Sequence, residues 1–516
     1  MTPEALKSLI AEGFNRIPIV KQVLADFDTG LGLYHKVAQG PYSFLFESVH
    51  GGERWGRYSI IGLPAKEWIK IQGHTVTVEN QQSRKTQTVN DPIDYLNNYY
   101  QQFKVPKSAS KKAGMPRFYG GLVGYVGYDA VGFFEEKLQA QLQKADPLKL
   151  PDILLMLSDE MVVLDNLSGT VSIVVYLTVD GTTSVDGRSG SIHDLDAANK
   201  RLSELANALL APQPASASSF SITRPTPVDE ANIGFHTSRE GYCQQVERIK
   251  EYIVAGDVMQ VVPSQRMSVP YQHDPLHLYR ALRYLNPSPY LFYLNLSGFH
   301  IVGSSPEILV RSEFEGEEEA SGKKVTLRPI AGTRRRGSTL SEDRALAEEL
   351  LSDPKEVAEH VMLMDLGRND VGRIAETGSV KITQDRVVEM YSHVMHIVSN
   401  VEGRLKPEFG PFDVLRATFP AGTLSGAPKI RAMEIIAELE EFKRGIYGGA
   451  VGYIGFDQSM DLAIAIRTAV IKDGQLHVQA GAGVVTDSQP MSEWMETLNK
   501  AQAVLNAMAL SVSVDS

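Results

Sequence analysis

The sequence is organised around one segment, which begins Arg328-Pro-Ile-Ala-Gly-Thr333 and ends Met364-Asp-Leu-Gly-Arg-Asn-Asp-Val-Gly-Arg373. Between these motifs, Asp353 can cap a helix by accepting hydrogen bonds from the first backbone N–H groups, and Pro354 suits the first helical position. The apolar run Val361-Met-Leu-Met364 continues the helical pattern. The segment therefore predicts a helix that starts after Asp353.

Two carboxylates on this predicted helix, Glu356 and Glu359, are three residues apart and therefore share one face. Such a pair most often faces solvent, and Glu356 also stands where it would complete a capping box with Asp353. Glu359 has no such alternative role, and the neighbouring apolar run predicts that it points inward.

A second pair of carboxylates, Glu493 and Glu496, follows Ala480-Gly-Ala-Gly483 and leads the helical pattern of Leu498, Ala501 and Leu505. Two helices that present carboxylates suit a hard divalent cation such as Mg²⁺, which prefers oxygen ligands and often takes only one or two from protein carboxylates. The sequence alone leaves open whether the two pairs meet.

Composition places the chain among ordinary globular proteins. It has 516 residues, of which 43% are hydrophobic and 22% charged, enough for two domains or one large composite core. The net charge of −11 argues against broad nucleic-acid binding, but an anionic substrate is compatible with it because an arginine or a metal can reverse the sign in a pocket. The single cysteine, Cys243, excludes intrachain disulfides and fits a reducing compartment, so we expect a cytoplasmic protein. We expect neither a signal peptide nor a membrane span, since no apolar run approaches roughly 18 residues.

The chain order predicts two regions of mixed α+β structure. Residues 17–179 are rich in strand patterns, including Ser43-Phe-Leu-Phe-Glu-Ser48, and an amphipathic helix follows around Leu195–Leu209. Polar, proline-containing stretches at 181–190 and 211–228 read as a loop and a linker. We therefore divide the chain into residues 17–230 and residues 231–516.

One pattern in the first region recurs in the second. Tyr119-Gly-Gly-Leu-Val-Gly-Tyr-Val-Gly-Tyr-Asp129 and Tyr447-Gly-Gly-Ala-Val-Gly-Tyr-Ile-Gly-Phe-Asp457 are identical at eight of eleven positions. The glycines predict strands that another backbone approaches closely. This repeated pattern suggests that two sheets contribute similar strands to one core.

The second region alternates helices and strands. Thr237 or Ser238 can cap a helix that extends to Ala255. Ile301-Val-Gly-Ser-Ser-Pro-Glu307 reads as a strand that ends in a glycine-serine loop able to donate backbone hydrogen bonds, with Glu307 facing whatever binds there. Two further strands and a proline-stiffened turn are expected at 258–262, 291–294 and 286–290.

Several of these motifs resemble the chorismate-utilising enzymes. They are Pro329-Ile-Ala-Gly-Thr333, Glu359–Asp370, Phe419-Pro-Ala-Gly-Thr-Leu-Ser-Gly-Ala-Pro-Lys429, and Gly481-Ala-Gly483 with its following glutamates. This resemblance spans about 235–510. Leu45-Phe-Glu-Ser48 and Asn286-Pro-Ser-Pro-Tyr290 resemble the tryptophan-sensing elements of the anthranilate-forming members, so it covers nearly the whole chain. The family implies an α+β fold, a layered β/α/α/β sandwich in which both regions share one body and the apparent domain boundary is a linker.

The resemblance also implies how chorismate is held. Glu359 and Glu496 would bind Mg²⁺ against the ring carboxylate, with Glu356 and Glu493 in support. Arg467, in an expected strand, offers a planar donor fork to the other carboxylate. Further donors to the substrate would come from Tyr447 and from the backbone at Gly332, Thr333, Gly481, Ala482 and Gly483.

Three residues correspond to the family's catalytic groups. Glu307 matches the general acid that protonates the departing 4-hydroxyl, which requires a raised pKa. His396 lies in an apolar strand, where a lone histidine is more often a core residue, but the resemblance makes it a site residue that assists loss of a leaving group. Thr423 could place its hydroxyl on the substrate or, equally, cap a helix.

Two positions discriminate between activities in the family. Isochorismate-forming and salicylate-forming members carry a lysine where this chain has Gln260, and aminodeoxychorismate-forming members often carry one in place of Ala331. The absence of both lysines favours direct attack by ammonia, which forms anthranilate and pyruvate. The alternatives are an aminodeoxychorismate-forming enzyme and a noncatalytic tryptophan-binding regulator.

The resemblance also implies partners and control. A separate glutamine amidotransferase subunit would supply ammonia, with two copies of each subunit in a heterotetramer. Tryptophan would inhibit by binding to the first region, 17–230, at Ser48, with Pro289, Tyr290 and Leu291 as the other wall. Residues 231–516 would carry catalysis. Phe46 replaces the usual leucine of the tryptophan-sensing motif, which alters the shape of the expected pocket.

Overall fold

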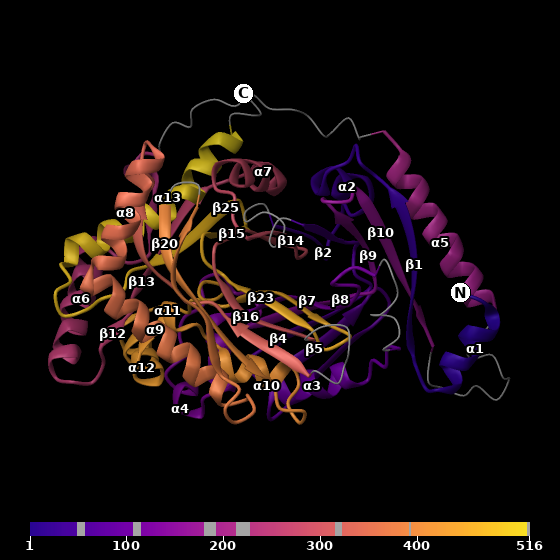
Figure 1. Cartoon of the computed structure of the whole chain (residues 1–516), viewed down its shortest axis with the longest axis horizontal. Coiled ribbons are helices and arrows are strands. Elements are labelled where there is room, and N and C mark those ends of the chain that lie inside the picture. The colour runs from indigo at the N-terminus through magenta and orange to yellow at the C-terminus, as the bar shows by residue number, and fades with distance from the viewer. Residues whose placement is uncertain are drawn as a thin grey trace.

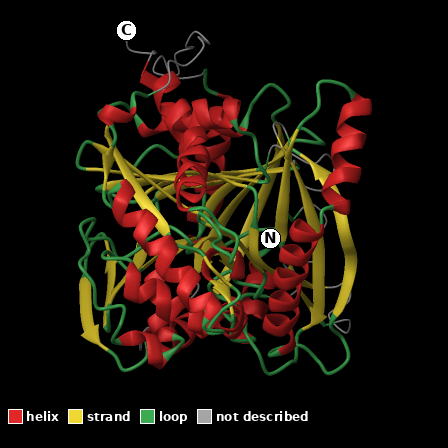
Figure 2. Cartoon of the chain, turned by 90° about the vertical axis from the view of Figure 1, so that its left-hand side faces the viewer, coloured by secondary structure: helices red, strands yellow, loops and turns green. Residues whose placement is uncertain are grey.

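The computed structural model describes residues 1–48, 57–106, 115–179, 192–212, 228–314, 322–391 and 394–512. Within these residues, two large antiparallel sheets of eleven and twelve strands form the body of the protein, and helices cover them (Figures 1 and 2). Both sheets contain strands from either side of the expected boundary near residue 230, so the expectation of one shared body is confirmed. The mixed α+β class is confirmed as well.

The first sheet joins five N-terminal strands to six C-terminal ones, and the junction is the pairing of β2 with β14. In spatial order its strands are β1 (Arg16–Leu24), β10 (Thr170–Thr178), β9 (Glu160–Asp165), β3 (Tyr58–Gly62), β2 (Ser43–Glu47), β14 (Tyr290–Asn295), β15 (Phe299–Ser305), β24 (Thr468–Lys472), β25 (Gln475–Gly481), β13 (Ser264–Pro270) and β11 (Gly234–Phe235).

The second sheet is also shared, and its junction is the pairing of β22 with β7. Its strands are β18 (Ile330–Arg335), β20 (Val394–Arg404), β17 (Lys323–Leu327), β16 (Ile308–Phe314), β23 (Met460–Ile464), β22 (Ala450–Gly455), β7 (Gly121–Val126), β8 (Ile153–Ser158), β4 (Glu67–Gln72), β5 (Thr75–Asn80) and β6 (Arg84–Thr88), with β19 (Lys381–Met390) also paired to β20. A separate short ladder joins β12 (Gln260–Val261) to β21 (Gly426–Ala427).

Thirteen α-helices accompany these strands in the described residues. They are α1 (Pro3–Ala11), α2 (Gly30–Val37), α3 (Pro92–Gln101), α4 (Glu136–Gln139), α5 (Ile192–Leu210), α6 (Arg239–Val254), α7 (Pro275–Leu285), α8 (Leu340–Ser352), α9 (Pro354–Gly372), α10 (Pro411–Thr418), α11 (Gly422–Ser425), α12 (Lys429–Leu439) and α13 (Pro490–Val512). No helix among these residues is long and apolar enough to cross a membrane.

The order of the layers differs from the expected β/α/α/β arrangement, because the two sheets face each other and the helices lie outside. Alternate residues of β14 show this: Leu291 and Tyr293 belong to the hydrophobic cluster that includes α2, α5, α7 and α13, whereas Phe292 and Leu294 belong to the core shared with the second sheet. The rings of Tyr125 on β7 and Phe299 on β15 meet across that core, 6.2 Å apart. The physical reason is that successive residues of a strand point to opposite faces, and the four successive apolar residues Leu291–Leu294 give β14 two apolar faces to cover.

The two echoing segments are not in separate sheets, contrary to expectation. They form β7 and β22, which pair side by side in one sheet with Gly124 opposite Gly452. A Cβ atom on Gly124 would lie 2.0 Å from the Leu154 carbonyl oxygen, and one on Gly452 would lie 2.1 Å from the Asp461 carbonyl oxygen. The close backbone approach predicted from the glycines is therefore confirmed.

Local capping signals placed the starts of two predicted helices correctly. Asp353 caps α9 by accepting hydrogen bonds from the N–H groups of Lys355 and Glu356, and Ser238 caps α6. The strand expected at 258–262 is present only as the two-residue strand β12. The prediction of a glycine-serine loop was wrong, because Gly303–Ser305 belong to β15. The loop and linker stretches lie largely outside the described residues.

Candidate active site

Glu307 lies between the end of β15 and the start of β16, with its side chain buried. The hydroxyl of Thr423 on α11 donates a hydrogen bond to its Oε1, 3.0 Å away. Burial raises the pKa of Glu307 to about 8, while the Thr423 hydroxyl and the positive charges of Arg467 and Lys500 act in the opposite direction. The carboxyl is therefore protonated at neutral pH and can act as an acid.

Thr423 does not cap α11, which begins after Ala421 and has no side-chain cap. Of the two roles that the sequence left open, the helix cap is thus excluded. Its hydroxyl is instead engaged by Glu307.

His396 lies on β20, where it pairs with Thr333 of β18. Its Nδ1 lies 3.0 Å from the carbonyl oxygen of Gly332 and 3.0 Å from the hydroxyl of Thr333. A carbonyl oxygen only accepts, so Nδ1 carries a proton in this contact, and the neutral ring keeps Nε2 as an acceptor. Burial lowers the pKa of His396 to about 4, which keeps the ring neutral. Gly332 has φ +72° at a register shift in β18.

Arg467 lies just beyond β23, not within a strand as expected, and has φ +49°. Burial lowers the pKa of its guanidinium, while Tyr391 and Glu307 act in the opposite direction. No carboxylate among the described residues forms an ion pair with it. A guanidinium removed from water in this way can bind an anion from outside.

Tyr447 and the glycines after β25 form another wall. Burial raises the pKa of the Tyr447 phenol, and a hydrogen bond with the backbone of Gly481 opposes that shift. A Cβ atom on Gly481 would lie 2.6 Å from the Pro263 carbonyl oxygen, and one on Gly483 would lie 2.5 Å from the Gln260 amide nitrogen. Gly481 therefore requires glycine, because the clash is with backbone, whereas a side chain in place of Gly483 would displace the Gln260 amide. Ala482 between them is buried.

Glu359 on α9 points inward as predicted, and the amide of Gln260 donates a hydrogen bond to its Oε1 at 2.8 Å. Burial raises the pKa of Glu359, opposed by the Gln260 amide, and the charges of Glu356 and Glu496 raise it further. Burial also raises the pKa of Glu493, and Glu496 adds to this shift.

The four carboxylates do not form a ready-made cage. Glu356 pairs with Arg334 at 2.9 Å, and Glu496 pairs with Lys500 at 2.7 Å. No group of three or more acidic, histidine or cysteine side chains within the described residues lies close enough to hold a metal ion. Glu359 and Glu496, from two different helices, remain the pair that a cation could join, since their mutual repulsion is what a divalent ion relieves.

Lys500 on α13 is a site residue that the sequence reasoning missed. Its Nζ donates a hydrogen bond to the Gly481 carbonyl oxygen at 3.0 Å, and its charge acts on the pKa values of Glu307, His396 and Glu359. Its position four residues after Glu496 on one helical face was the available signal. Gln260 was noticed only for the lysine it replaces, and its contact with Glu359 was not foreseen.

A family model of chorismate binding enzymes matches residues 59–506. The chain belongs to this family. Anthranilate synthase component 1 from Neisseria meningitidis serogroup A is 54% identical over 499 residues, 96% of each chain. The protein of the same name from Pseudomonas putida is 50% identical over 99% of each chain.

Solved structures show the same fold. Anthranilate synthase component I from Streptococcus pneumoniae superposes with a TM-score of 0.72 at 37% identity, over 89% of this chain and 94% of that one. The menaquinone-specific isochorismate synthase from Escherichia coli superposes with a TM-score of 0.68 at 18% identity, covering 98% of this chain and 99% of that one. At that identity the second match supports the fold alone.

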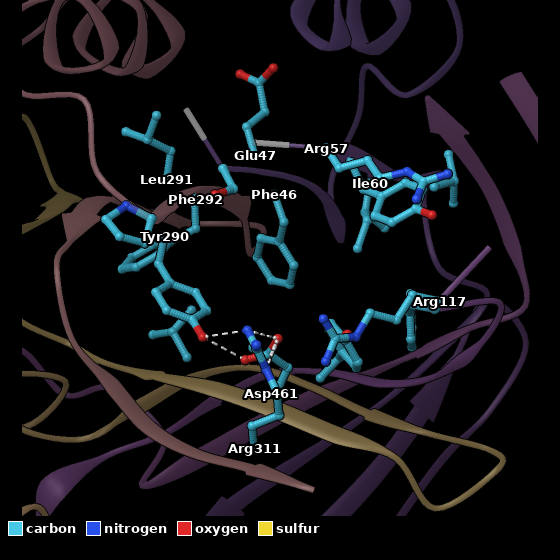
Figure 3. A pocket seen from close by; sticks show the side chains of 18 residues that line it. Phe46, Glu47, Arg57, Ile60, Arg117, Tyr290, Leu291, Phe292, Arg311 and Asp461 are labelled. Carbon is cyan, nitrogen blue, oxygen red and sulfur yellow. Dashed lines mark hydrogen bonds and ion pairs between the residues drawn. The ribbon is translucent and has the colours of Figure 1, made fainter. Parts of the chain in front are cut away.

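Apart from the candidate active site, this chorismate-binding enzyme has a cavity of about 290 Å³, called here the second cavity (Figure 3). Residues from β2, β3 and β14 of the first sheet and from β16, β22 and β23 of the second sheet line it. All four residues of the expected tryptophan site line it, namely Ser48, Pro289, Tyr290 and Leu291. The Ser48 hydroxyl is buried without a hydrogen-bond partner among the described residues.

Four charged residues that line this cavity were not predicted, namely Arg57, Arg117, Arg311 and Asp461. Arg311 on β16 and Asp461 on β23 form an ion pair at 2.8 Å, and the Tyr290 hydroxyl donates to Asp461 at 2.8 Å. Glu47 is turned away (Figure 3), where the Tyr279 hydroxyl donates to it at 2.6 Å and Arg283 pairs with it at 3.0 Å. The cavity therefore combines an apolar wall with few free polar groups, which suits a small amphipathic ligand.

Proposed function

We propose that this chain converts chorismate and ammonia to anthranilate, pyruvate and water. The observation that carries the proposal is the contact between Gln260 and Glu359, because an amide occupies the position from which a lysine would activate water. Without that base, water is not activated as a nucleophile, and ammonia can attack the reactive ring carbon. The names of relatives that are about half identical over nearly their whole length support the same activity.

In this proposal the chain's residues divide the work between binding and proton transfer. Arg467 and Tyr447 hold the enolpyruvyl carboxylate together with the backbone at Gly332, Thr333 and Gly481–Gly483. Ammonia forms a bond to C2 of the ring, the ring double bonds shift, and the 4-hydroxyl leaves as water with the proton of Glu307. The C2 proton is then lost, the ether bond at C3 breaks, and pyruvate departs.

His396 suits a role in that second stage. Its ring is neutral with an unprotonated Nε2, so it can take up a proton as pyruvate leaves. Thr423 keeps the carboxyl of Glu307 in one orientation through their hydrogen bond.

The residues present fit a magnesium ion held by Glu359 and Glu496, with Glu356 and Glu493 nearby. Bound there, Mg²⁺ would neutralise the ring carboxylate and the repulsion between these side chains. Binding of the ion to Glu496 would weaken the ion pair between Glu496 and Lys500.

The chain's ammonia would come from a glutamine amidotransferase subunit in a cytoplasmic heterotetramer. Tryptophan would inhibit by occupying the second cavity, where the Ser48 hydroxyl, which has no partner among the described residues, can bind its polar end while the apolar wall receives the indole ring. Residues 17–230 and 231–516 both line this cavity, so regulation in the proposal depends on the two regions together.

The activity is tested by incubating the purified chain with chorismate, MgCl₂ and ammonium at alkaline pH and following anthranilate fluorescence. Anthranilate and pyruvate should appear in equal amounts, and Glu307→Gln should form neither. Accumulation of a non-fluorescent aminated product would instead indicate aminodeoxychorismate, and tryptophan binding without any turnover would indicate a regulator.

A further inference from the structure

Beneath the site lies a buried ion pair that the proposed chemistry does not use. Arg444 follows α12 with its side chain 1% exposed, and Glu440, at the end of α12, is 8% exposed. Nε of Arg444 lies 2.8 Å from one carboxylate oxygen of Glu440, and a terminal nitrogen lies 2.6 Å from the other. Removing two charges from water is costly, so such a pair is a weak source of stability and calls for another role.

The remaining donors of Arg444 bind two backbone carbonyls from separate segments. One terminal nitrogen donates to the Leu424 carbonyl oxygen at 2.7 Å, and the other donates to the Val262 carbonyl oxygen at 2.6 Å. The N–H of Val262 in turn donates to the Ser425 carbonyl oxygen at 3.0 Å. The guanidinium therefore fixes α11 against the strand end that follows β12.

Each segment carries a functional side chain close to its contact. Leu424 follows Thr423, whose hydroxyl reaches Glu307, and Val262 lies two residues after Gln260, whose amide reaches Glu359. Arg444 is thus connected through Leu424 and Thr423 to the proposed acid, and through Val262 and Gln260 to the proposed metal ligand.

The same pair also contacts the wall that would receive the enolpyruvyl carboxylate. The guanidinium lies 5.5 Å from the ring centroid of Tyr447. Oε1 of Glu440 accepts hydrogen bonds from the N–H and the hydroxyl of Ser264 at 2.8 and 2.9 Å. Ser264 is the ladder partner of Gly481 across β13 and β25.

We propose that Arg444, held by Glu440, is a positioning residue that keeps the acid side, the metal side and the substrate wall of the site in one fixed arrangement. The inference rests on the proposed function. A planar guanidinium fits this role because its donors point in fixed directions, whereas a lysine ammonium is a point charge on a flexible stem.

The test compares Arg444→Lys and the double variant Arg444→Met with Glu440→Leu. The double variant removes both charges and leaves neither one buried and unpaired, so it separates geometry from folding. A control is Lys36→Met with Asp28→Leu, because Lys36 also forms a largely buried ion pair, at 2.8 Å, and donates to the Leu209 carbonyl oxygen, far from the site.

We expect kcat for anthranilate to fall about 100-fold in both Arg444 variants, since displacements of about 1 Å at a site have effects of this size. The alkaline limb of the kcat–pH profile should move upward, because a displaced Thr423 no longer lowers the pKa of Glu307 while Arg467 and Lys500 remain. Chorismate affinity, measured by calorimetry with MgCl₂ and no ammonium, should weaken. The control should lose thermal stability without either change.

If the double variant keeps the wild-type pH profile and chorismate affinity while unfolding at a lower temperature, the pair is structural only and the inference is wrong. Wild-type protein that forms no anthranilate would overturn the proposed function instead. In that case the calorimetric comparison still decides the inference, since it requires only chorismate binding.

Discussion

The Thr423 hydroxyl and the Glu307 carboxyl form a hydrogen bond of 3.0 Å although the two residues are 116 positions apart in the chain. The pKa of Glu307 is subject to two opposing influences, of which this hydrogen bond is one. Burial makes the carboxyl hold its proton, and the donated hydrogen bond favours the ionised form. Because the balance lies at a pKa of about 8, small changes at Thr423 should appear directly in the pH dependence of turnover.

Thr423→Val should shift the alkaline limb of the kcat–pH profile to higher pH. The protonated form of Glu307 is the active acid, so activity falls as pH rises through its pKa, and loss of the hydroxyl raises that pKa. Thr423→Ser, which keeps the hydroxyl, is the control and should retain the wild-type profile. An unchanged limb in the valine variant would show that another group controls it.

Glu307→Gln should abolish turnover and stabilise the fold at alkaline pH. The unfolded chain releases the Glu307 proton near pH 4.5, whereas the folded chain keeps it until about pH 8. Stability therefore falls across this window as pH rises, and the loss is complete above it. Each pKa unit corresponds to about 1.4 kcal/mol, so the gain at pH 9 is at most a few kcal/mol. Urea unfolding at pH 4.5 and 9 measures it, and equal differences from wild type at both values would contradict it.

Glu359→Gln and Glu496→Gln should each remove turnover at ordinary MgCl₂ concentrations with the fold intact. Each loses one carboxylate from the proposed magnesium pair, which weakens the hold on the ring carboxylate. Titration of activity against MgCl₂ and circular dichroism measure the two effects. Glu348→Gln on α8 is exposed and should behave as wild type. Full activity of either site variant without added magnesium would refute the metal assignment.

Gln260→Lys should raise the MgCl₂ concentration needed for activity. The amide of Gln260 lies 2.8 Å from Glu359, so a lysine there would place a positive charge beside a proposed metal ligand and compete with the ion. It would also place a base near the ring, and part of the product should become isochorismate. Gln260→Met removes the hydrogen bond without adding a base and should give no isochorismate. Chromatography of the products distinguishes these outcomes.

Ser48→Phe should relieve inhibition by tryptophan with little loss of uninhibited activity. The side chain would fill part of the second cavity, and inhibition requires tryptophan to bind the less active state more tightly than the active one. The ammonia-dependent rate at increasing tryptophan concentrations measures the effect. Ser203→Phe on the exposed face of α5 is the control. Undiminished sensitivity in the Ser48 variant would place the inhibitor elsewhere.

Local sequence signals predicted the elements that depend on neighbouring residues. Asp353 and Ser238 cap their helices because capping needs only the next few backbone N–H groups. The four residues of the second cavity were found through motifs, although they come from segments more than 200 residues apart.

Contacts set by long-range packing were not predictable in the same way. The pairing of Glu356 with Arg334, which engages one of the expected supporting carboxylates, depends on how α9 lies against β18. The order of the layers and the pairing of β7 with β22 likewise follow from which apolar faces meet, and a period of two in the sequence does not specify the partner.

The pairing of β7 with β22 also determines when the chain can fold during synthesis. β7 ends at Val126, but the strand beside it is complete only once the ribosome has added Gly455. Until then the edge of β7 stays open, and contacts between such distant segments form slowly. An open strand edge can pair with the wrong chain, so this enzyme should depend on chaperones during translation and should not yield a stable N-terminal fragment.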